Sequence, residues 1–271
     1  MGLRINTNTP ALNTSRVLRR STDALNKTLE RLSSGLRINR AADDAAGLAI
    51  AEGFRSQVRG TQVAQRNAQD GVSLVQTAEG ALSETTNILQ RIRELAVQAG
   101  NGTQSTNNRI ALDNEVRQLL GQIDSIAKDT SFNGISILSV SQSVTLQAGA
   151  MTSQTLVIAV GGAKTNDLGV SGVTLSTMAG AVAAISTVDR ALQSVTSLRS
   201  SFGAFQNRLE FTINTLAIQE ENSSASESAI RDANIASETI SFTRNQILVS
   251  AGTSVLAQAN VVPQTALQLL G

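Results

Sequence analysis

The stretch VDRALQSVTSLRSSFGAFQNRLEFTINTL, residues 188–216, decides the fold class of the chain. Its apolar side chains recur every three or four positions, at Val188, Leu192, Val195, Leu198, Phe202, Phe205, Leu209, Ile213 and Leu216. This period places them along one face of a long α-helix, in a run close to the heptad repeat of coiled coils. Because propensity alone does not hold so long a helix in water, this face must pack against other helices.

The same spacing appears elsewhere in the chain. It recurs at Leu74, Ala78, Ala81, Thr85, Ile88, Ile92 and Leu95, and again at Leu112, Val116, Leu119, Ile123 and Ile126. We expect the first of these helices to run to about residue 99 and the segment GNGTQSTNN (100–108) to separate the two. Shorter apolar runs predict one helix near each end of the chain. Gly35 is predicted to end the first helix, and Asp43 and Asp44 to cap the next one.

The period changes to two in the middle of the chain. Val144, Leu146 and Ala148 alternate with polar residues, as do Leu156, Ile158 and Val160. Alternation predicts short strands, so we expect a β-hairpin at about 135–175, with GGAKTNDLG (161–169) as a loop. The polar segment QEENSSASES (219–228) is interpreted as a boundary. The predicted fold class is therefore mainly α: long antiparallel helices in a coiled-coil rod with a small β-hairpin insertion.

Composition argues against an enzyme. The chain contains no His and no Cys, which removes the commonest general base and the thiolate metal ligands. Asp43 and Asp44 are adjacent carboxylates, but without His a helix cap is the better interpretation. We therefore predict no catalytic residue, no metal site and no cofactor.

Charge and hydropathy limit the partners. Residues 1–40 hold eight basic and two acidic side chains, whereas residues 201–271 hold three basic and six acidic ones. Opposite charge suggests that the two ends meet. No aromatic residues interleave with the basic ones, so nucleic-acid binding is not expected, and no stretch is apolar and long enough to predict membrane insertion. No secretory signal peptide is recognisable, so we expect the protein to stay inside the cell or to leave without a cleaved signal.

The closing segment NVVPQTALQLLG, residues 260–271, is uncharged and rich in aliphatic side chains. Two terminal helices are too few to cover their own apolar stripes, so we expect other copies of the chain to cover them. A contact between unlike surfaces that does not close into a ring produces a filament. The residues predicted to make these inner contacts are Leu25, Leu29, Leu32, Ile240, Ile247, Val255, Leu267 and Leu270.

Longer motifs point to a family. The chain contains SSGLRINRAADDAAGLAI (33–50), LQRIRELAVQAGNGT (89–103) and AGTSVLAQANVVPQTALQLLG (251–271). With these segments in order over roughly the first 140 and last 90 residues, the sequence resembles bacterial flagellin, in a short form with almost no variable outer domain. The resemblance implies two domains. Residues 1–44 with 227–271 would form an inner-core coiled coil, disordered in the monomer, and residues 45–226 an outer-core helical rod domain.

The resemblance also implies function and partners. It implies a homopolymer, the filament used for swimming motility, secreted unfolded through type III export to an extracellular location. It further implies contacts with the export apparatus, with an export chaperone at the C-terminal region, and with filament cap and junction proteins. A hook–filament junction protein, which shares the terminal pattern, is the alternative, and an intracellular coiled-coil scaffold is a more distant one.

Two smaller sites follow from matching positions. The resemblance implies that Arg91, Leu95 and Glu115 contact the Toll-like innate immune receptor for flagellin when the protein is a monomer. Gly203 lies within a strong helical stripe, where Gly costs about 1 kcal/mol relative to Ala. It marks either a close helix crossing or a site that tunes the packing states of the filament.

Overall fold

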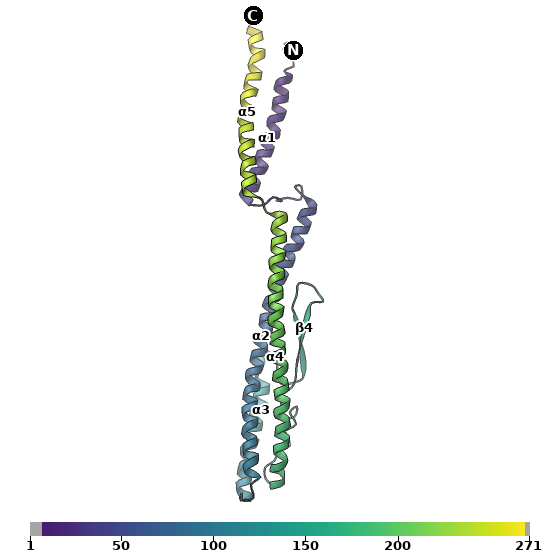
Figure 1. The fold of residues 1–271 in the computed structure, drawn as a ribbon, viewed down its shortest axis with the longest axis vertical. Helices are drawn as coiled ribbons and strands as arrows, with labels where there is room; N and C mark the ends of the chain where they lie inside the picture. Colours follow the sequence, from purple (N-terminus) through teal and green to yellow (C-terminus); the bar gives the residue numbers. More distant parts are fainter. Residues whose placement is uncertain (1–6, 269–271) are drawn as a thin grey trace. The chain divides into compact units, whose positions relative to one another are not determined.

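The computed structural model describes residues 7–268, with side chains except at 262–264 and 266–268. The elements in chain order are α1 (Thr9–Ser34), α2 (Ala45–Ala99), α3 (Thr106–Asp129), β1 (Ser131–Phe132), β2 (Ile135–Ser136), β3 (Gln142–Gln147), β4 (Thr155–Val160), α4 (Met178–Arg231) and α5 (Ile235–Gln268). Figure 1 shows the long helices and the small hairpin beside them. The predicted mainly α fold with a β-hairpin insertion is confirmed.

The chain divides into two compact units. One comprises Met1–Ser56 with Asn222–Gly271, and the other comprises Gln57–Glu221. In the first unit, α1 and α5 run antiparallel: Arg31 near the end of α1 pairs with Glu238 near the start of α5, at 3.2 Å. At the opposite end of the pair, Asn8 donates a hydrogen bond of 2.8 Å to the carbonyl of Ala259.

The second unit is a helical bundle. Ion pairs across α2 and α4 fix their antiparallel register, from Arg93–Asp189 at 2.7 Å to Glu79–Arg199 at 3.5 Å. The core contains many of the predicted stripe residues, including Ile92, Val116, Ile123, Val188, Val195, Phe202 and Leu209. Leu82 and Leu89, which were not predicted, are also buried there, while their predicted neighbours Ala81 and Ile88 are partly buried against the core. The heptad-like spacing of 188–216 therefore lines this core as predicted.

The hairpin β3–β4 covers one side of this bundle. Its strands pair antiparallel from Gln142↔Val160 to Gln147↔Thr155, and alternate residues of β4 are buried. A Cβ atom at position 71 would collide with Cδ1 of Leu146 as that side chain now lies, so glycine at this position permits the close approach of α2 to β3. The two strands and their turn, residues 142–160, cover a shorter stretch of sequence than the 135–175 predicted for the hairpin. A second, two-residue hairpin, β1–β2, turns at Asn133 and Gly134, both with positive φ, and was not predicted.

Helix ends follow the predicted chemistry at two positions. Gly35 adopts a left-handed φ of 71° and its N–H donates to the carbonyl of Arg31, which ends α1. Asp44 caps α2, accepting from the N–H of Gly47 at 2.8 Å. The prediction for Asp43 is wrong: its carboxylate accepts from the N–H groups of Arg40 and Asn39, at 3.1 and 3.3 Å, in the turn before the helix.

The polar segment 219–228 does not end a helix, but the boundary between the two compact units, between Glu221 and Asn222, falls within it. α4 continues to Arg231, since the segment contains neither Gly nor Pro and Ser226 bonds back to the carbonyl of Asn222 at 2.7 Å. At the end of α4, backbone groups form hydrogen bonds with the segment that follows α1. The N–H of Arg37 donates to the carbonyl of Arg231 at 2.6 Å, and that of Ala233 to the carbonyl of Gly35 at 2.9 Å.

Candidate interaction surfaces

The fully buried residues of α1 are small and polar, and the large apolar side chains of the α1–α5 pair, such as Leu18 and Leu256, are at most half-buried. The buried residues of α1 are Ser21 and Thr28, and no residue of α5 with a described side chain is fully buried. Gly252 lets α5 approach Leu18, whose Cδ1 would lie 3.2 Å from a Cβ at that position. Because these apolar side chains are only partly buried, the two-helix pair gains only part of the stabilisation that their full burial would give.

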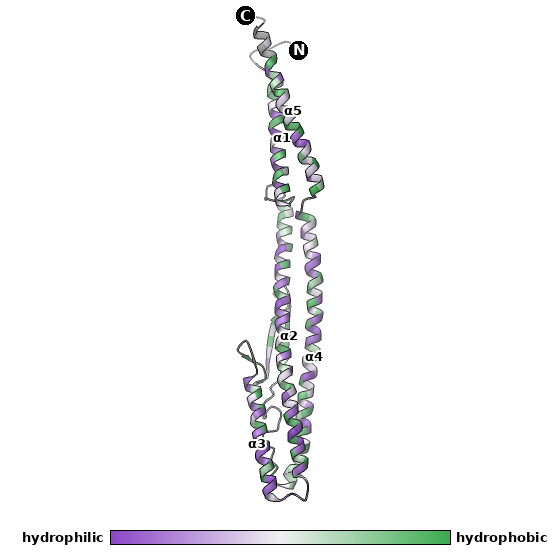
Figure 2. Ribbon diagram, turned by 90° about the vertical axis from the view of Figure 1, so that its left-hand side faces the viewer, coloured by the Kyte–Doolittle hydropathy of each residue, from purple (hydrophilic) through white to green (hydrophobic). Residues whose placement is uncertain are grey.

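The same two helices expose many aliphatic side chains. Green segments along both ribbons in Figure 2 mark their hydrophobic residues. The exposed aliphatic side chains are Leu12, Val17, Leu29, Ile235, Ile240, Ile247, Leu248, Val255 and Val261, each more than 40% exposed. We call this set the outward apolar face of the first unit. This number of exposed aliphatic side chains on a single helix pair favours an interaction site.

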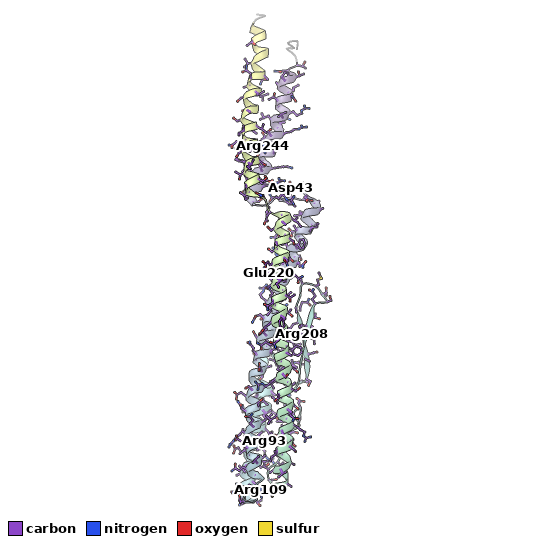
Figure 3. All side chains as sticks on the ribbon, viewed as in Figure 1. Asp43, Arg93, Arg109, Arg208, Glu220 and Arg244 are labelled. Carbon is purple, nitrogen blue, oxygen red and sulfur yellow. The ribbon has the colours of Figure 1, made fainter. Side chains whose placement is uncertain are left out.

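The predicted inner contacts fall in different environments. Leu29, Ile240, Ile247 and Val255 belong to the outward apolar face, with exposures of 49, 63, 62 and 54%. Leu25 and Leu32 are half-buried. The side chain of Leu267 and the whole of Leu270 lie outside the described residues. Ile240 and Ile247 flank a shallow depression on α5 that also includes Arg244, the helix's one described cation, labelled in Figure 3.

In the second unit, Arg91 on α2 and Glu115 on α3 form an exposed pair. Nη2 of Arg91 donates to Oε1 of Glu115 at 2.9 Å, and Nη1 donates to Glu94 at 3.1 Å. The hydrogen bond to Glu115, followed by that to Glu94, raises the pKa of Arg91 above its usual value. The three side chains remain 44–68% exposed, so they present a ready-oriented polar surface to a partner.

Leu95 does not share that surface. Its side chain is 1% exposed and lies in the core of the bundle, which removes it as a direct receptor contact. The reason is its position on the apolar stripe of α2, three residues after the buried Ile92. Sequence similarity placed Leu95 with Arg91, and the two lie one helical turn apart, but Leu95 packs in the core whereas Arg91, beside the apolar stripe, has a side chain that is 51% exposed.

Gly203 does not mark a close helix crossing within the chain. A Cβ built at this position meets no atom within 4 Å. The crossing interpretation is therefore wrong for the second unit. The alternative, that Gly203 acts in contacts between copies, stays a prediction.

One surface was missed by sequence reasoning. Phe211 on α4 is 73% exposed, and beside it an open groove of about 630 Å³ runs between α4 and the turn of the β3–β4 hairpin. Arg208, labelled in Figure 3, lines the same groove. The available signal was that Phe211 falls between the stripe residues Leu209 and Ile213, so its side chain cannot point into the core.

Within residues 7–268, no helix has a window apolar and long enough to cross a membrane. The same part of the chain contains no group of three or more acidic side chains placed to hold a metal ion.

Comparison with protein families gives two matches. Residues 5–143 match the bacterial flagellin N-terminal helical region, and residues 185–270 match the bacterial flagellin C-terminal helical region. The flagellin of Bacillus subtilis (strain 168) is 43% identical over 304 residues, covering 99% of this chain and 100% of the relative. A flagellar filament 31.3 kDa core protein of Treponema maltophilum is 42% identical over 283 residues, covering 98% and 99%.

Solved structures agree with these matches. The crystal structure of Bacillus cereus flagellin is 35% identical, with a TM-score of 0.51, and the match covers 56% of this chain and 88% of that one. A putative flagellar hook-associated protein from Vibrio parahaemolyticus reaches a TM-score of 0.60 at 11% identity, which shows likeness of fold alone. With family matches at both ends and relatives aligned over nearly the whole length, the chain belongs to the bacterial flagellin family.

Proposed function

We propose that this chain polymerises into the bacterial flagellar filament through the outward apolar face of α1 and α5. Membership of the flagellin family makes it a structural filament subunit and not an enzyme. The names of its relatives, flagellin and flagellar filament core protein, favour a filament subunit over the junction-protein alternative.

The observation that carries the proposal is the contrast between the seam and the outer surface of the α1–α5 pair. The seam buries Ser21 and Thr28, whereas Ile240 and Ile247 are more than 60% exposed. Burying one such aliphatic side chain contributes about 1.5–3 kcal/mol. Contacts with neighbouring copies would therefore add stability that the α1–α5 pair alone does not supply. This favours terminal segments that become ordered as the subunit docks.

Seeded assembly tests the proposal. Filament seeds are added to purified monomer, and elongation is followed by light scattering and negative-stain electron microscopy. The Ile240→Ala, Ile247→Ala double variant is expected to slow elongation by at least about tenfold, because the lost burial exceeds 1.4 kcal/mol. A matched double variant of exposed polar residues on the same helix, Gln246→Ala with Gln258→Ala, should elongate as the parent chain does.

Two outcomes would contradict the proposal. Equal elongation by the Ile and Gln variants would show that the outward apolar face takes no part in assembly. Failure of the parent chain to form long filaments under every seeding condition would favour the junction-protein alternative. Removal of residues 250–271 is the stronger test of the apolar C-terminus and should abolish elongation.

The proposal also covers the export route and the other proteins that a filament subunit would contact. A filament subunit has to leave the cell, so the proposal includes type III export in an unfolded state and an extracellular location. It also includes an export chaperone on the C-terminal region, together with the filament cap and junction proteins. Support comes from the resemblance in the terminal segments. Culture supernatant and sheared filaments, probed for the chain in a strain with and without the export apparatus, test the export route.

A second candidate function rests on the Arg91–Glu115 surface. We infer that the monomer is recognised there by the Toll-like innate immune receptor for flagellin, since both side chains are exposed and held together at 2.9 Å. The Arg91→Ala, Glu115→Ala variant should lose activity in receptor reporter cells. The matched control is Arg93→Ala with Asp189→Ala, an ion pair of similar exposure in the same unit. Equal loss in both variants would indicate a folding defect instead of a contact.

A further inference from the structure

The connector between α2 and α3 contains an Asn-Gly pair, Asn101 and Gly102, both exposed. Asparagine followed by glycine can cyclise when the glycine nitrogen attacks the asparagine side chain, since glycine adds no Cβ to hinder the approach. We propose that this connector is a self-modifying site at which Arg109 promotes the conversion of Asn101 to aspartate and isoaspartate.

The first argument concerns the nucleophile, the nitrogen of Gly102. It attacks only after losing its proton, and the resulting negative charge is shared with the carbonyl oxygen of Asn101. That oxygen accepts from Nη2 of Arg109 at 3.0 Å and from the N–H of Gln104 at 3.2 Å. A guanidinium and an N–H directed at a developing oxyanion stabilise it in the way that catalytic sites do.

The position of Arg109 is set by a second contact. Its Nε donates to the carbonyl of Ala99, the last residue of α2, at 2.8 Å. Arg109 therefore spans the C-terminal end of one helix and the reacting peptide unit (its label marks the end of the second unit in Figure 3). A guanidinium held by two carbonyls is preorganised and does not have to be recruited during the reaction.

The second argument concerns the electrophile, the side-chain amide carbon of Asn101. Oδ1 of Asn101 accepts from the N–H of Thr103 at 3.2 Å. This hydrogen bond draws electron density from the amide carbon and holds the side chain folded back over the following backbone. The nucleophile and the electrophile are thus each assisted by a donor from the same connector.

The reaction balances with water as the only co-reactant. A solvent base removes the proton of the Gly102 nitrogen, which forms a bond to Cγ of Asn101. The Cγ–Nδ2 bond then breaks, and the nitrogen leaves as ammonia with a proton from solvent. Water opens the cyclic imide at either carbonyl, leaving aspartate or isoaspartate and a new carboxylate next to Arg109.

A second Asn-Gly pair in the chain serves as an internal comparison. Asn133 and Gly134 form the turn of the β1–β2 hairpin, with φ values of 49° and 78°. The pairs Ser131↔Ser136 and Phe132↔Ile135 hold this turn on both sides. Within the described residues no side chain donates to the carbonyl of Asn133. Its turn must open before cyclisation, so it should react more slowly than Asn101.

The experiment follows both sites in one folded sample. Monomer is incubated in mildly alkaline buffer, digested with trypsin and analysed by mass spectrometry with chromatographic separation of aspartate from isoaspartate. Cleavage after Arg93, Arg109, Lys128 and Lys164 puts Asn101 and Asn133 in separate peptides. In denaturant the two sites should react at similar rates. In the folded chain Asn101 should react faster than Asn133.

The Arg109→Gln variant distinguishes acceleration of the reaction by Arg109 from a reaction that depends only on a flexible connector. Loss of one charge-assisted hydrogen bond from the anion should slow conversion at Asn101 by about tenfold, with Asn133 unchanged. A connector that had merely loosened would react faster, so the direction of the change is decisive. A rate at Asn101 that is unchanged or raised in Arg109→Gln, or equal rates at both sites in the folded parent, would overturn the proposal. Thermal unfolding of the variant confirms that it is folded.

Discussion

The carboxylate of Asp113 on α3 accepts a hydrogen bond of 2.6 Å from the backbone N–H of Leu175, 62 residues later in the chain. Three turns further along α3, Asp124 accepts from both the N–H and the hydroxyl of Thr165, at 2.8 and 3.0 Å. Between these two anchors the irregular segment 163–175 buries Leu168, Val170 and other apolar side chains. The segment is therefore part of the core of the second unit, held to α3 by two carboxylates.

Asp113→Ala should lower the free energy of unfolding of the full chain by about 2–3 kcal/mol. The substitution leaves the buried N–H of Leu175 without an acceptor and also removes the ion pair with Arg117 at 2.9 Å. Urea unfolding followed by circular dichroism measures this loss. The neighbouring exposed Asn114→Ala is the control and should change stability by less than about 0.5 kcal/mol. Equal effects of the two substitutions would show that Asp113 does not anchor the segment.

Leu95→Ala should lower the free energy of unfolding by about 2–5 kcal/mol, since it opens a cavity in the core of the second unit. Val97→Ala, on the exposed side of the same turn with 52% of its surface accessible, is the matched control. If Leu95 acted as a direct receptor contact instead, its substitution would reduce receptor activation without reducing stability.

Gly203→Ala should raise the free energy of unfolding of the monomer by about 0.4–1 kcal/mol, because it reduces the entropy of the unfolded chain and the added methyl meets no atom within 4 Å. Thermal unfolding of monomer measures the gain. The same variant tests the packing prediction: filaments of altered waveform under the electron microscope would support it. Filaments indistinguishable from those of the parent chain would leave Gly203 without a role between copies.

Asp43 should titrate below the ordinary aspartate value of about 3.9. The backbone hydrogen bond from Arg40 holds the pKa of its carboxyl down, with a further contribution from Asn39. A lowered folded pKa means that the stability contributed by this carboxylate is present above about pH 4 and is lost as the pH falls through the folded pKa. Nuclear magnetic resonance titration of the Asp43 carboxyl measures this. A pKa at or above the ordinary aspartate value of about 3.9 would contradict the prediction.

Much of the helical architecture followed from the period of apolar residues. The stripe from Val188 to Leu216 and that from Leu74 to Leu95 fall in the core of the second unit, because a repeat of three and four residues can bury only one face of a helix. The cap at Gly35 was equally readable, since the left-handed conformation favours glycine. The polar segment 219–228 contains the boundary between the two units but not the end of a helix, because polarity lowers burial without preventing helix formation.

The residues of the interaction surfaces were less predictable from the sequence than the helices were. Arg91 and Glu115 were named from similarity, and the structure shows that they are in contact, whereas similarity alone did not reveal that Leu95 faces the core. Phe211 and Arg109 were not predicted. The groove beside Phe211 also involves residues distant in sequence, and Arg109 binds a backbone carbonyl, which has no sequence signature.

By itself the sequence determined the helices, the hairpin, the absence of His and Cys, and the apolar excess at both ends of the chain. These depend on local periodicity and composition. Only the tertiary structure decided which apolar residues remain uncovered, with Ile240 and Ile247 outward while Ser21 and Thr28 fill the seam. It also decided that the carboxylates of Asp113 and Asp124 hold a distant segment. The physical reason is that burial and hydrogen-bond partners are properties of packed pairs, which a single helical repeat does not specify.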